Sequence, residues 1–189
     1  MEITAETSNF FIYNILSDAV LIDSKIKGDS RGYFNRLLCI QELREFINFE
    51  TIVNINHSFS LKKGTTRGIH LQLNDDAEEK FIYCISGEID DYIVDLRKDS
   101  QTYLSWKRIN LKANDEKLVF VPKGFGHGFQ TLSENSEIIY FVTQFHSNVN
   151  ECAVSFFDNR LNIELSTQVS EISEKDSNAL SIEQYESLK

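Results

Sequence analysis

Short segments rich in β-branched and aromatic residues dominate the middle of the chain, and they constrain its fold more than any other feature. Such segments favour strands over helices. They follow one another with only short gaps, which predicts an all-β jelly-roll or sandwich rather than alternating strand–helix units. The expected strands cover residues 51–56, 68–73, 80–85, 88–96, 105–111, 117–121 and 138–144, with a turn at residues 86–88.

A few short helices complete the expected fold. Residues 40–48 place Leu43, Phe46 and Ile47 on one face at helical spacing, which predicts a helix. The tail from about residue 178 is predicted to form a terminal helix. The chain has one proline, no internal repeat and no linker, and its apolar content of 41% can fill a sizeable core. Residues 1–189 are therefore expected to form a single domain.

Charge and cysteine content narrow the class of protein. The net charge of −10 argues against a general nucleic-acid binder, because phosphate backbones need clustered Lys and Arg side chains. Cys39, Cys84 and Cys152 form no CxxC pair, which predicts buried thiols in a reducing cytoplasm rather than a disulfide framework or a zinc site. The N-terminus lacks a basic signal-peptide region, and no apolar run could span a bilayer. We expect a soluble, cytoplasmic protein without nucleic-acid or membrane partners.

Alternation within the expected strands places polar side chains together. Residues two apart in a strand share a face, so His70 lies with Gln72, and Lys80 lies with Ile82 and Cys84. Tyr140 shares a face with the apolar residues of its own strand. These faces line a polar lumen if they point inward, and they are ordinary solvent faces if they point outward. Alternation alone leaves both readings open.

Two histidine-containing segments could carry chemistry. In residues 66–72, Arg67 could bind a phosphate through its guanidinium, and His70 could act as a base near neutral pH. The alternative is a hydrogen-bonded strand histidine with an arginine near the strand end. In residues 122–129, three glycines predict a turn that a ligand can approach closely, with His127 inside it. His127 is then either a ligand contact or a structural turn histidine.

A metal site is one alternative for these histidines. Metal-binding cupin barrels use a His-x-His pair, a Glu and a later His, and would make this chain a metal-dependent isomerase or dioxygenase. Here Gln72 replaces the second histidine of the pair. Glu78 or Glu79 could supply a carboxylate, but Lys80 places a cation beside it. The sequence therefore predicts no metal site.

Taken together, the motifs resemble the dTDP-4-dehydrorhamnose 3,5-epimerase family from Asp29 to about Asp176. The RGxHxQ segment, the VDLR stretch and the GFxHGF segment occur in the family's order, which makes the match specific. The residues that carry it are 29–34 (DSRGYF), 54–58 (NINHS), 67–72 (RGIHLQ), Lys80, 87–97 (GEIDDYIVDLR), Ser100, Thr102, Trp106, 122–129 (PKGFGHGF), Tyr140 and 173–176 (SEKD).

The resemblance implies a cupin-like jelly-roll barrel that forms a homodimer and uses no cofactor. Its implied reaction inverts C3, C5 or both in a nucleotide-linked 4-keto-6-deoxyhexose, a step of deoxysugar and surface-polysaccharide biosynthesis. The implied catalytic residues are the base His70, its orienting carboxylate Asp176, the acid Tyr140 on the opposite face of the sugar, and Lys80 near the developing oxyanion. The implied substrate-binding residues are Arg31, Asn54, Asn56, Arg67, Gln72 and His127, with Arg31 reaching into the neighbouring subunit's site.

Several positions depart from the family pattern where nucleotide or sugar preference could be set. These departures favour a further alternative, a catalytically silent barrel that binds a sugar nucleotide, while the retained catalytic residues disfavour it. The departures are Phe145 and His146 in place of a common tyrosine pair, Asn35 and Arg36 where Glu is common, and Leu165 and Ser166 in place of Trp-Pro.

Overall fold

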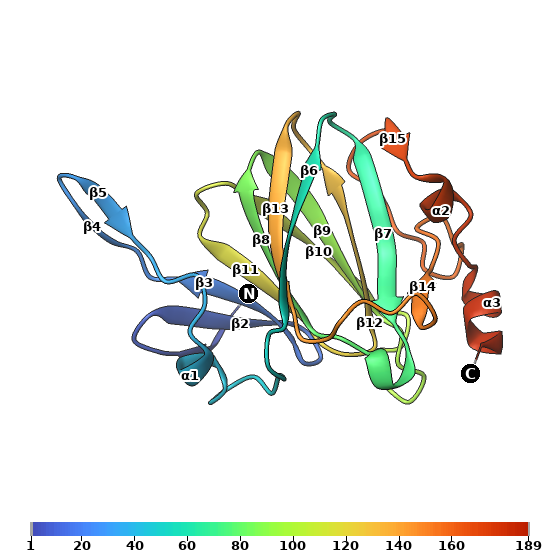
Figure 1. Ribbon diagram of the computed structural model, residues 1–189, viewed down its shortest axis with the longest axis horizontal. Helices are drawn as coiled ribbons and strands as arrows, with labels where there is room; N and C mark the ends of the chain where they lie inside the picture. The colour runs from blue at the N-terminus through green and yellow to red at the C-terminus, as the bar shows by residue number, and fades with distance from the viewer. Residues whose placement is uncertain (1, 189) are drawn as a thin grey trace.

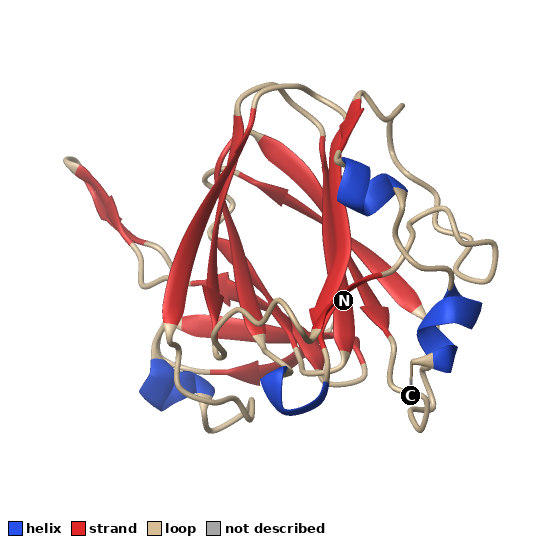
Figure 2. Cartoon of the chain, turned by 45° about the vertical axis from the view of Figure 1, so that its right-hand side comes forward, coloured by secondary structure: helices blue, strands red, loops and turns tan. Residues whose placement is uncertain are grey.

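The computed structural model describes residues 2–188, which form two facing sheets and a projecting hairpin (Figures 1 and 2). The larger sheet contains β1 (Ile3–Glu6), β2 (Phe10–Leu16), β3 (Ala19–Ser24), β6 (Asn54–Ser60), β8 (Lys80–Ser86), β11 (Lys117–Val121) and β13 (Ser136–Val142), in the order β1-β2-β3-β11-β8-β13-β6. The smaller sheet contains β7 (Thr65–Gln72), β9 (Glu88–Asp95), β10 (Trp106–Lys112), β12 (Phe125–Thr131) and β14 (Glu151–Ala153), in the order β10-β9-β12-β7-β14. A short strand, β15 (Glu171–Ile172), pairs with β7 in parallel. The expected all-β class is confirmed.

The strands expected between residues 51 and 144 are all present, with ends that differ by a few residues. The turn at residues 86–88 carries the chain from one sheet to the other, so the consecutive strands β8 and β9 do not pair with each other. The sequence analysis missed β1, β2, β3 and β12, together with the short strands at residues 27–29, 32–34, 151–153 and 171–172. Strand β3 is buried on both faces, and its apolar run therefore lacks the alternation that identifies a half-buried strand.

The predicted turn around His127 is wrong, because His127 lies in the middle of strand β12. The glycines of this segment serve close packing between strands instead. A Cβ on Gly128 would approach the Arg67 carbonyl oxygen to 2.7 Å, and a Cβ on Gly68 would approach the Gly128 Cα to 2.6 Å. The absence of these side chains lets β7 and β12 pair closely, so that His127 lies directly opposite His70 in the ladder.

Apolar side chains fill three layers. One cluster lies between the sheets and includes Ile82, Ile93 and Ile138. The other two cover the outer faces of the sheets, around Phe81 on the larger sheet and Tyr92 on the smaller. Strands β8 and β9 therefore bury both of their faces, which fixes the sheets rigidly around the space between them.

The predicted helix at residues 40–48 is too long, because α1 spans only Ile40–Leu43. Its N-cap, Cys39, makes no side-chain cap hydrogen bond, and the following Phe46 and Ile47 are weak helix formers. Leu43 and Ile47 are buried against the larger sheet, as the spacing predicted, but Phe46 is about half exposed. Contact with the sheet, rather than helical propensity, holds this segment.

The C-terminal segment packs beside the smaller sheet (Figures 1 and 2). Helix α2 (Glu174–Ser177) begins at Ser173, whose side chain accepts a hydrogen bond from the Asp176 N–H. Helix α3 (Ile182–Ser187) has a capping box and buries Ile182 and Tyr185, so the expected terminal helix is confirmed. No helix in the described part of the chain is long and apolar enough to cross a membrane. Cys84 and Cys152 are buried as predicted, while Cys39 is only half-buried.

A hairpin formed by β4 (Lys27–Asp29) and β5 (Gly32–Phe34) projects away from the barrel in both views (Figures 1 and 2). Its base is attached to the barrel by the buried carboxylate of Glu116. This carboxylate accepts hydrogen bonds from the hydroxyl groups of Tyr33 at 2.8 Å and Tyr83 at 2.9 Å, and from the Asn35 amide. Glu116 therefore couples the hairpin to strand β8.

Replacing Glu116 with alanine should lower the free energy of unfolding by about 2–3 kcal/mol, because the buried Tyr83 hydroxyl loses its charged acceptor. For a chain of this length, the melting temperature should fall by roughly 4–12 °C. Thermal denaturation followed by circular dichroism measures this change. The matched control is Glu137→Ala, which removes an exposed carboxylate paired with His57. Equal melting temperatures for the two variants would contradict the anchoring role.

Candidate active site

Two adjoining cavities, of about 170 and 280 Å³, open between the sheets and share His70, Lys80 and Tyr140. We call them the inner and outer lobes. The predicted site residues line one or both lobes, except Asp176, which lies behind His70, and Arg31, which lies on the hairpin. The inner lobe adds Ser58, Arg67, His127, Gly128, Phe129 and Ile138, and the outer lobe adds Asn54, Asn56, Leu71, Gln72, Glu78, Val142, Gln144, His146 and Glu151.

The two sheets supply opposite walls of this site. His70 and His127 come from β7 and β12 of the smaller sheet. Lys80 and Tyr140 come from β8 and β13 of the larger sheet. The polar faces therefore point inward, which decides the question that alternation left open. A ligand held between the sheets would meet an imidazole on one side and a phenol on the other.

His70 is paired with a buried carboxylate. Its Nε2 atom lies 2.5 Å from Oδ1 of Asp176, whose side chain is 4% exposed. The Gly68 N–H donates a hydrogen bond to the Asp176 carboxylate, and the Asp176 N–H donates to the Ser173 hydroxyl. These bonds hold both the carboxylate and its backbone in place. Burial alone would raise the pKa of Asp176, but the hydrogen bond and charge of His70 outweigh it and lower the pKa. The carboxylate can orient the imidazole and stabilise its protonated form.

A second histidine–carboxylate pair lies beside the first, and sequence analysis missed its acid. His127 Nε2 lies 2.6 Å from Oδ1 of Asp91, which is fully buried. The other oxygen of Asp91 has no hydrogen-bond partner among residues 2–188. Asp91 lies on the same face of β9 as Ile89 and Ile93, both of which face the core between the sheets. A carboxylate on an otherwise apolar strand face must be buried, and a buried carboxylate needs a partner. This sequence feature could have revealed Asp91 as a paired acid.

The opposite wall carries an ammonium and a phenol. The Lys80 Nζ atom lies 3.0 Å from the Glu78 carboxylate, within the outer lobe. Burial, together with the negative charge of Glu78, raises the pKa of Tyr140, and the positive charge of Arg67 opposes this shift. The phenol therefore keeps its proton at neutral pH and can donate it. Arg67 donates hydrogen bonds to Ser60 and to the Phe59 carbonyl, but it forms no ion pair within residues 2–188.

The side chains of Gln72 and Arg31 are engaged by other residues of the chain, although Gln72 also lines the outer lobe. The Gln72 amide donates to the carbonyls of Asp76 and Phe145 and accepts from the Ser147 N–H, so it holds the loop that carries His146. The Arg31 side chain is 88% exposed and pairs only with Asp29 of its own hairpin, among the described residues. Arg31 therefore does not reach the site of its own chain.

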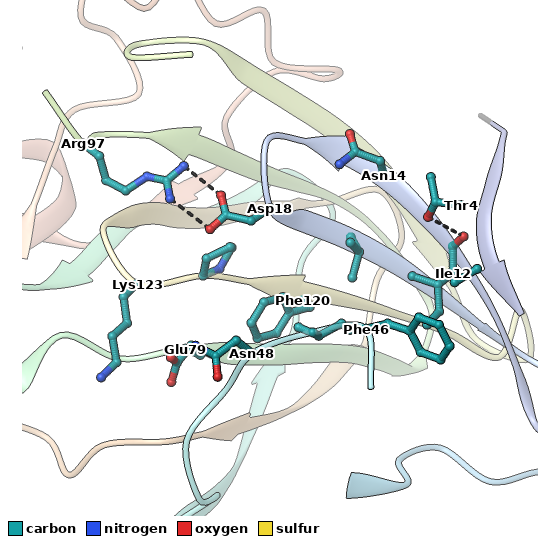
Figure 3. Close-up of a pocket in the computed structure, with 14 residues that line it drawn as sticks. Thr4, Ile12, Asn14, Asp18, Phe46, Asn48, Glu79, Arg97, Phe120 and Lys123 are labelled. Carbon is teal, nitrogen blue, oxygen red and sulfur yellow. Dashed lines mark hydrogen bonds and ion pairs between the residues drawn. The ribbon is translucent and has the colours of Figure 1, made fainter. Parts of the chain in front are cut away.

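A larger cavity of about 530 Å³ lies on the outer face of the larger sheet, where most of the charged side chains form ion pairs (Figure 3). Arg97 points at Asp18, with an Nη2–Oδ1 distance of 2.9 Å, and also binds the buried Asp95. Lys123 pairs with Glu50. Two histidine–carboxylate pairs, an ammonium, a guanidinium and a phenol converge between the sheets instead, which makes the inner and outer lobes the better candidate site.

The carboxylates considered for a metal site point to different sides of strand β8. Glu78 faces the outer lobe, whereas Glu79 lines the cavity on the outer face and accepts a hydrogen bond from the Thr143 hydroxyl. Among residues 2–188, no three His, Cys, Asp or Glu side chains gather closely enough to hold a metal ion.

An imidazole and a phenol on opposite walls of a jelly-roll barrel suit an isomerase, and the relatives of this chain are enzymes of that class. The sequence profile of one family, dTDP-4-dehydrorhamnose 3,5-epimerase, matches residues 14–184. The chain belongs to this family, and its fold is the cupin-like jelly roll that the sequence predicted.

Known relatives cover nearly the whole chain. The dTDP-4-dehydrorhamnose 3,5-epimerase of Salmonella typhimurium is 37% identical over 175 residues, which is 92% of this chain and 95% of the relative. The crystal structure of the Elizabethkingia anophelis epimerase is 31% identical with a TM-score of 0.89, covering 93% of this chain and 97% of that one. A Legionella pneumophila 3,5-epimerase solved with dTDP-4-keto-L-rhamnose is 30% identical with a TM-score of 0.86, covering 92% and 93%.

Proposed function

We propose that this enzyme inverts C3, C5 or both in a nucleotide-linked 4-keto-6-deoxyhexose, without a metal or organic cofactor. The observation that carries the proposal is that His70 and Tyr140 line one cavity from opposite sheets, with Lys80 in the same lining. Inversion at carbon needs removal of a proton from one face and its return to the other. The imidazole on one wall and the phenol on the other provide a proton-transfer group at each face of the sugar.

His70 is the base in this proposal. A proton next to a ketone is weakly acidic, and its removal needs a base within about 3 Å and a stabilised enolate. Asp176 fixes the imidazole and stabilises it once it carries the proton. Lys80 donates to the ketone oxygen as negative charge develops there, an effect worth about 3–4 kcal/mol for one oxyanion donor. Tyr140 then protonates the carbon from the opposite wall.

Substrate binding uses the remaining polar groups of the two lobes. Arg67 has no ion-pair partner among the described residues, so its guanidinium is available to a phosphate. His127, held by Asp91, lies beside it in the inner lobe. Asn54 and Asn56 in the outer lobe offer amides to sugar or nucleotide oxygens. This arrangement suits an anionic ligand in a chain whose overall charge is −10.

Solvent deuterium exchange tests the reaction. In D₂O, the enzyme should incorporate deuterium next to the ketone of dTDP-4-keto-6-deoxyglucose, seen by proton NMR as loss of the C3 or C5 signals. Prior treatment with a chelator should leave the rate unchanged. Tight binding without exchange at either carbon would select a silent binding barrel. Loss of exchange after chelation, restored by a metal, would select a metal-dependent enzyme.

We also propose that the enzyme is a cytoplasmic homodimer of deoxysugar biosynthesis, in which Arg31 reaches the partner's site. Two features support the dimer. The exposed hairpin carries Arg31 away from its own barrel (Figure 1). The edge strand β6 exposes Ile55, Phe59 and the following Leu61, with Ile55 64% exposed, and an uncovered apolar edge is otherwise an aggregation hazard.

Mixed dimers test the role of Arg31. Arg31→Ala and His70→Asn variants should each be nearly inactive alone. When the two are refolded together, random pairing should restore roughly a quarter of wild-type activity, since half of the dimers contain one complete site. If Arg31 acted within its own chain, mixing would restore nothing. Sedimentation velocity should give a dimer, and a monomer with full activity would contradict the proposal.

A further inference from the structure

Glu78 is a carboxylate inside the site that the proposed reaction does not use. It precedes β8 by two residues and therefore points to the same side as Lys80, into the outer lobe. Its Oε1 atom lies 3.0 Å from the Lys80 Nζ atom, and the two side chains are only 13% and 10% exposed. Glu79, between them, points out of the barrel. The strand thus presents one carboxylate and one ammonium to the same cavity.

Glu78 is the only acid that forms an ion pair with Lys80 among residues 2–188. An ammonium taken out of water needs such a partner, and the partner also fixes its direction. Because a lysine has three N–H donors, a bond to Glu78 leaves two for a ligand. A ketone oxygen in the cavity can therefore bind Lys80 without breaking its contact with Glu78.

The same carboxylate acts on the phenol. After burial, the negative charge of Glu78 is the next cause that raises the pKa of Tyr140, while Arg67 lowers it. Several other charged or titratable groups face this part of the cavity from the neighbouring elements. They are His70 on β7, Lys80 on β8, His127 on β12, Glu151 on β14 and His146 in the loop after β13.

We propose that Glu78 is a positioning residue, which holds the Lys80 ammonium at the ketone oxygen. The proposal deepens the proposed epimerase function and rests on it. It assigns Glu78 no contact with the reacting carbon. Its effects are therefore on the chemical step and its pH dependence, rather than on binding of the nucleotide.

Glu78→Gln keeps the size of the side chain and removes its charge. We expect kcat for deuterium exchange and inversion to fall about tenfold, with KM changed less than about twofold. The alkaline limb of the kcat profile should move to lower pH, because loss of a neighbouring negative charge favours ionisation of the phenol. Glu78→Asp, which retains the charge, should keep the wild-type alkaline limb even where its kcat is reduced.

Glu183→Gln is the matched control, since it makes the same change on the exposed side of α3, outside the cavity and away from β6, and it should keep wild-type kinetics. Circular dichroism establishes that each variant is folded. If Glu78→Gln does not fold, the alkaline limb of the kcat profile of Glu78→Asp is measured at several salt concentrations instead. Wild-type kcat and an unshifted limb in folded Glu78→Gln would overturn the role of Glu78 alone. Absence of exchange in the wild-type enzyme would instead overturn the proposed function.

Discussion

Replacing His70 with asparagine is expected to lower the rate of deuterium exchange next to the ketone by about 10²–10⁴-fold, the usual contribution of a general base. Asparagine retains a polar side chain on β7 but cannot accept the proton. Asp176 keeps its hydrogen bonds from the backbone N–H of Gly68 and from its own N–H to Ser173, so the local structure should persist. Exchange followed by proton NMR, under single-turnover conditions, measures the effect.

The control for this experiment is Lys98→Asn. Lys98 lies in the loop after β9 and donates to the Glu186 carbonyl on α3, outside both lobes. Replacing this basic side chain with asparagine should leave exchange within about twofold of the wild-type rate. If His70→Asn is folded and still exchanges within tenfold of the wild-type enzyme, the proton is removed by another group and the proposed base is wrong.

Replacing Tyr140 with phenylalanine is expected to separate proton removal from inversion. The variant lacks only the phenol oxygen, so His70 and Lys80 should still generate the enolate and return a proton from the same face. Deuterium should therefore continue to enter the substrate, while formation of the inverted sugar should fall by about 10²–10⁴-fold. NMR of the product mixture reports incorporation and configuration together.

The pH dependence of the wild-type enzyme gives a second view of this phenol. Burial first, and then Glu78, raise the pKa of Tyr140 from its ordinary value of 10. A donor with a raised pKa stays protonated as the pH increases, so this group should not limit kcat at neutral or weakly alkaline pH. The limb that it controls should lie above pH 10 and should be absent from Tyr140→Phe.

Tyr103→Phe serves as the control for the phenol, because the Tyr103 hydroxyl donates to Glu186 on α3, away from both lobes. It should retain wild-type inversion. Equal losses of exchange and inversion in Tyr140→Phe would mean that the phenol supports the first proton transfer rather than the second. If Tyr140→Phe inverts the sugar at the wild-type rate, Tyr140 is not the acid and another group protonates the carbon from the opposite face.

The local chemistry of the site could be predicted from the sequence. Composition and period-two patterns identified the strands from β6 to β13, except β12, and placed His70 on the same face as Gln72. The motifs around Arg67 and His127, together with Tyr140, indicated the family that the profile match then established. Short-range rules suffice for these features because neighbouring residues alone decide the side of a strand on which a residue lies.

Other features depended on contacts between residues far apart in the chain. Alternation could not predict which face of β8 points toward the site, because both faces of this strand are buried. Only the position of the partner sheet shows that Lys80 and Glu78 face the site while Glu79 faces away from it. The same holds for Asp91, whose pairing with His127 is visible only once β9 and β12 are adjacent. Glycines that resembled a turn around His127 in sequence allow two strands to approach in space.

The sequence by itself determined which residues can give, take or stabilise a proton and which strands carry them, because side-chain type and strand period are local properties. Only the tertiary structure decided that His70 and Tyr140 face each other across one cavity. That arrangement depends on how two sheets pack, and packing is set by the apolar clusters on all their faces at once. It also left Arg31 outside its own barrel, where no local pattern could have placed it.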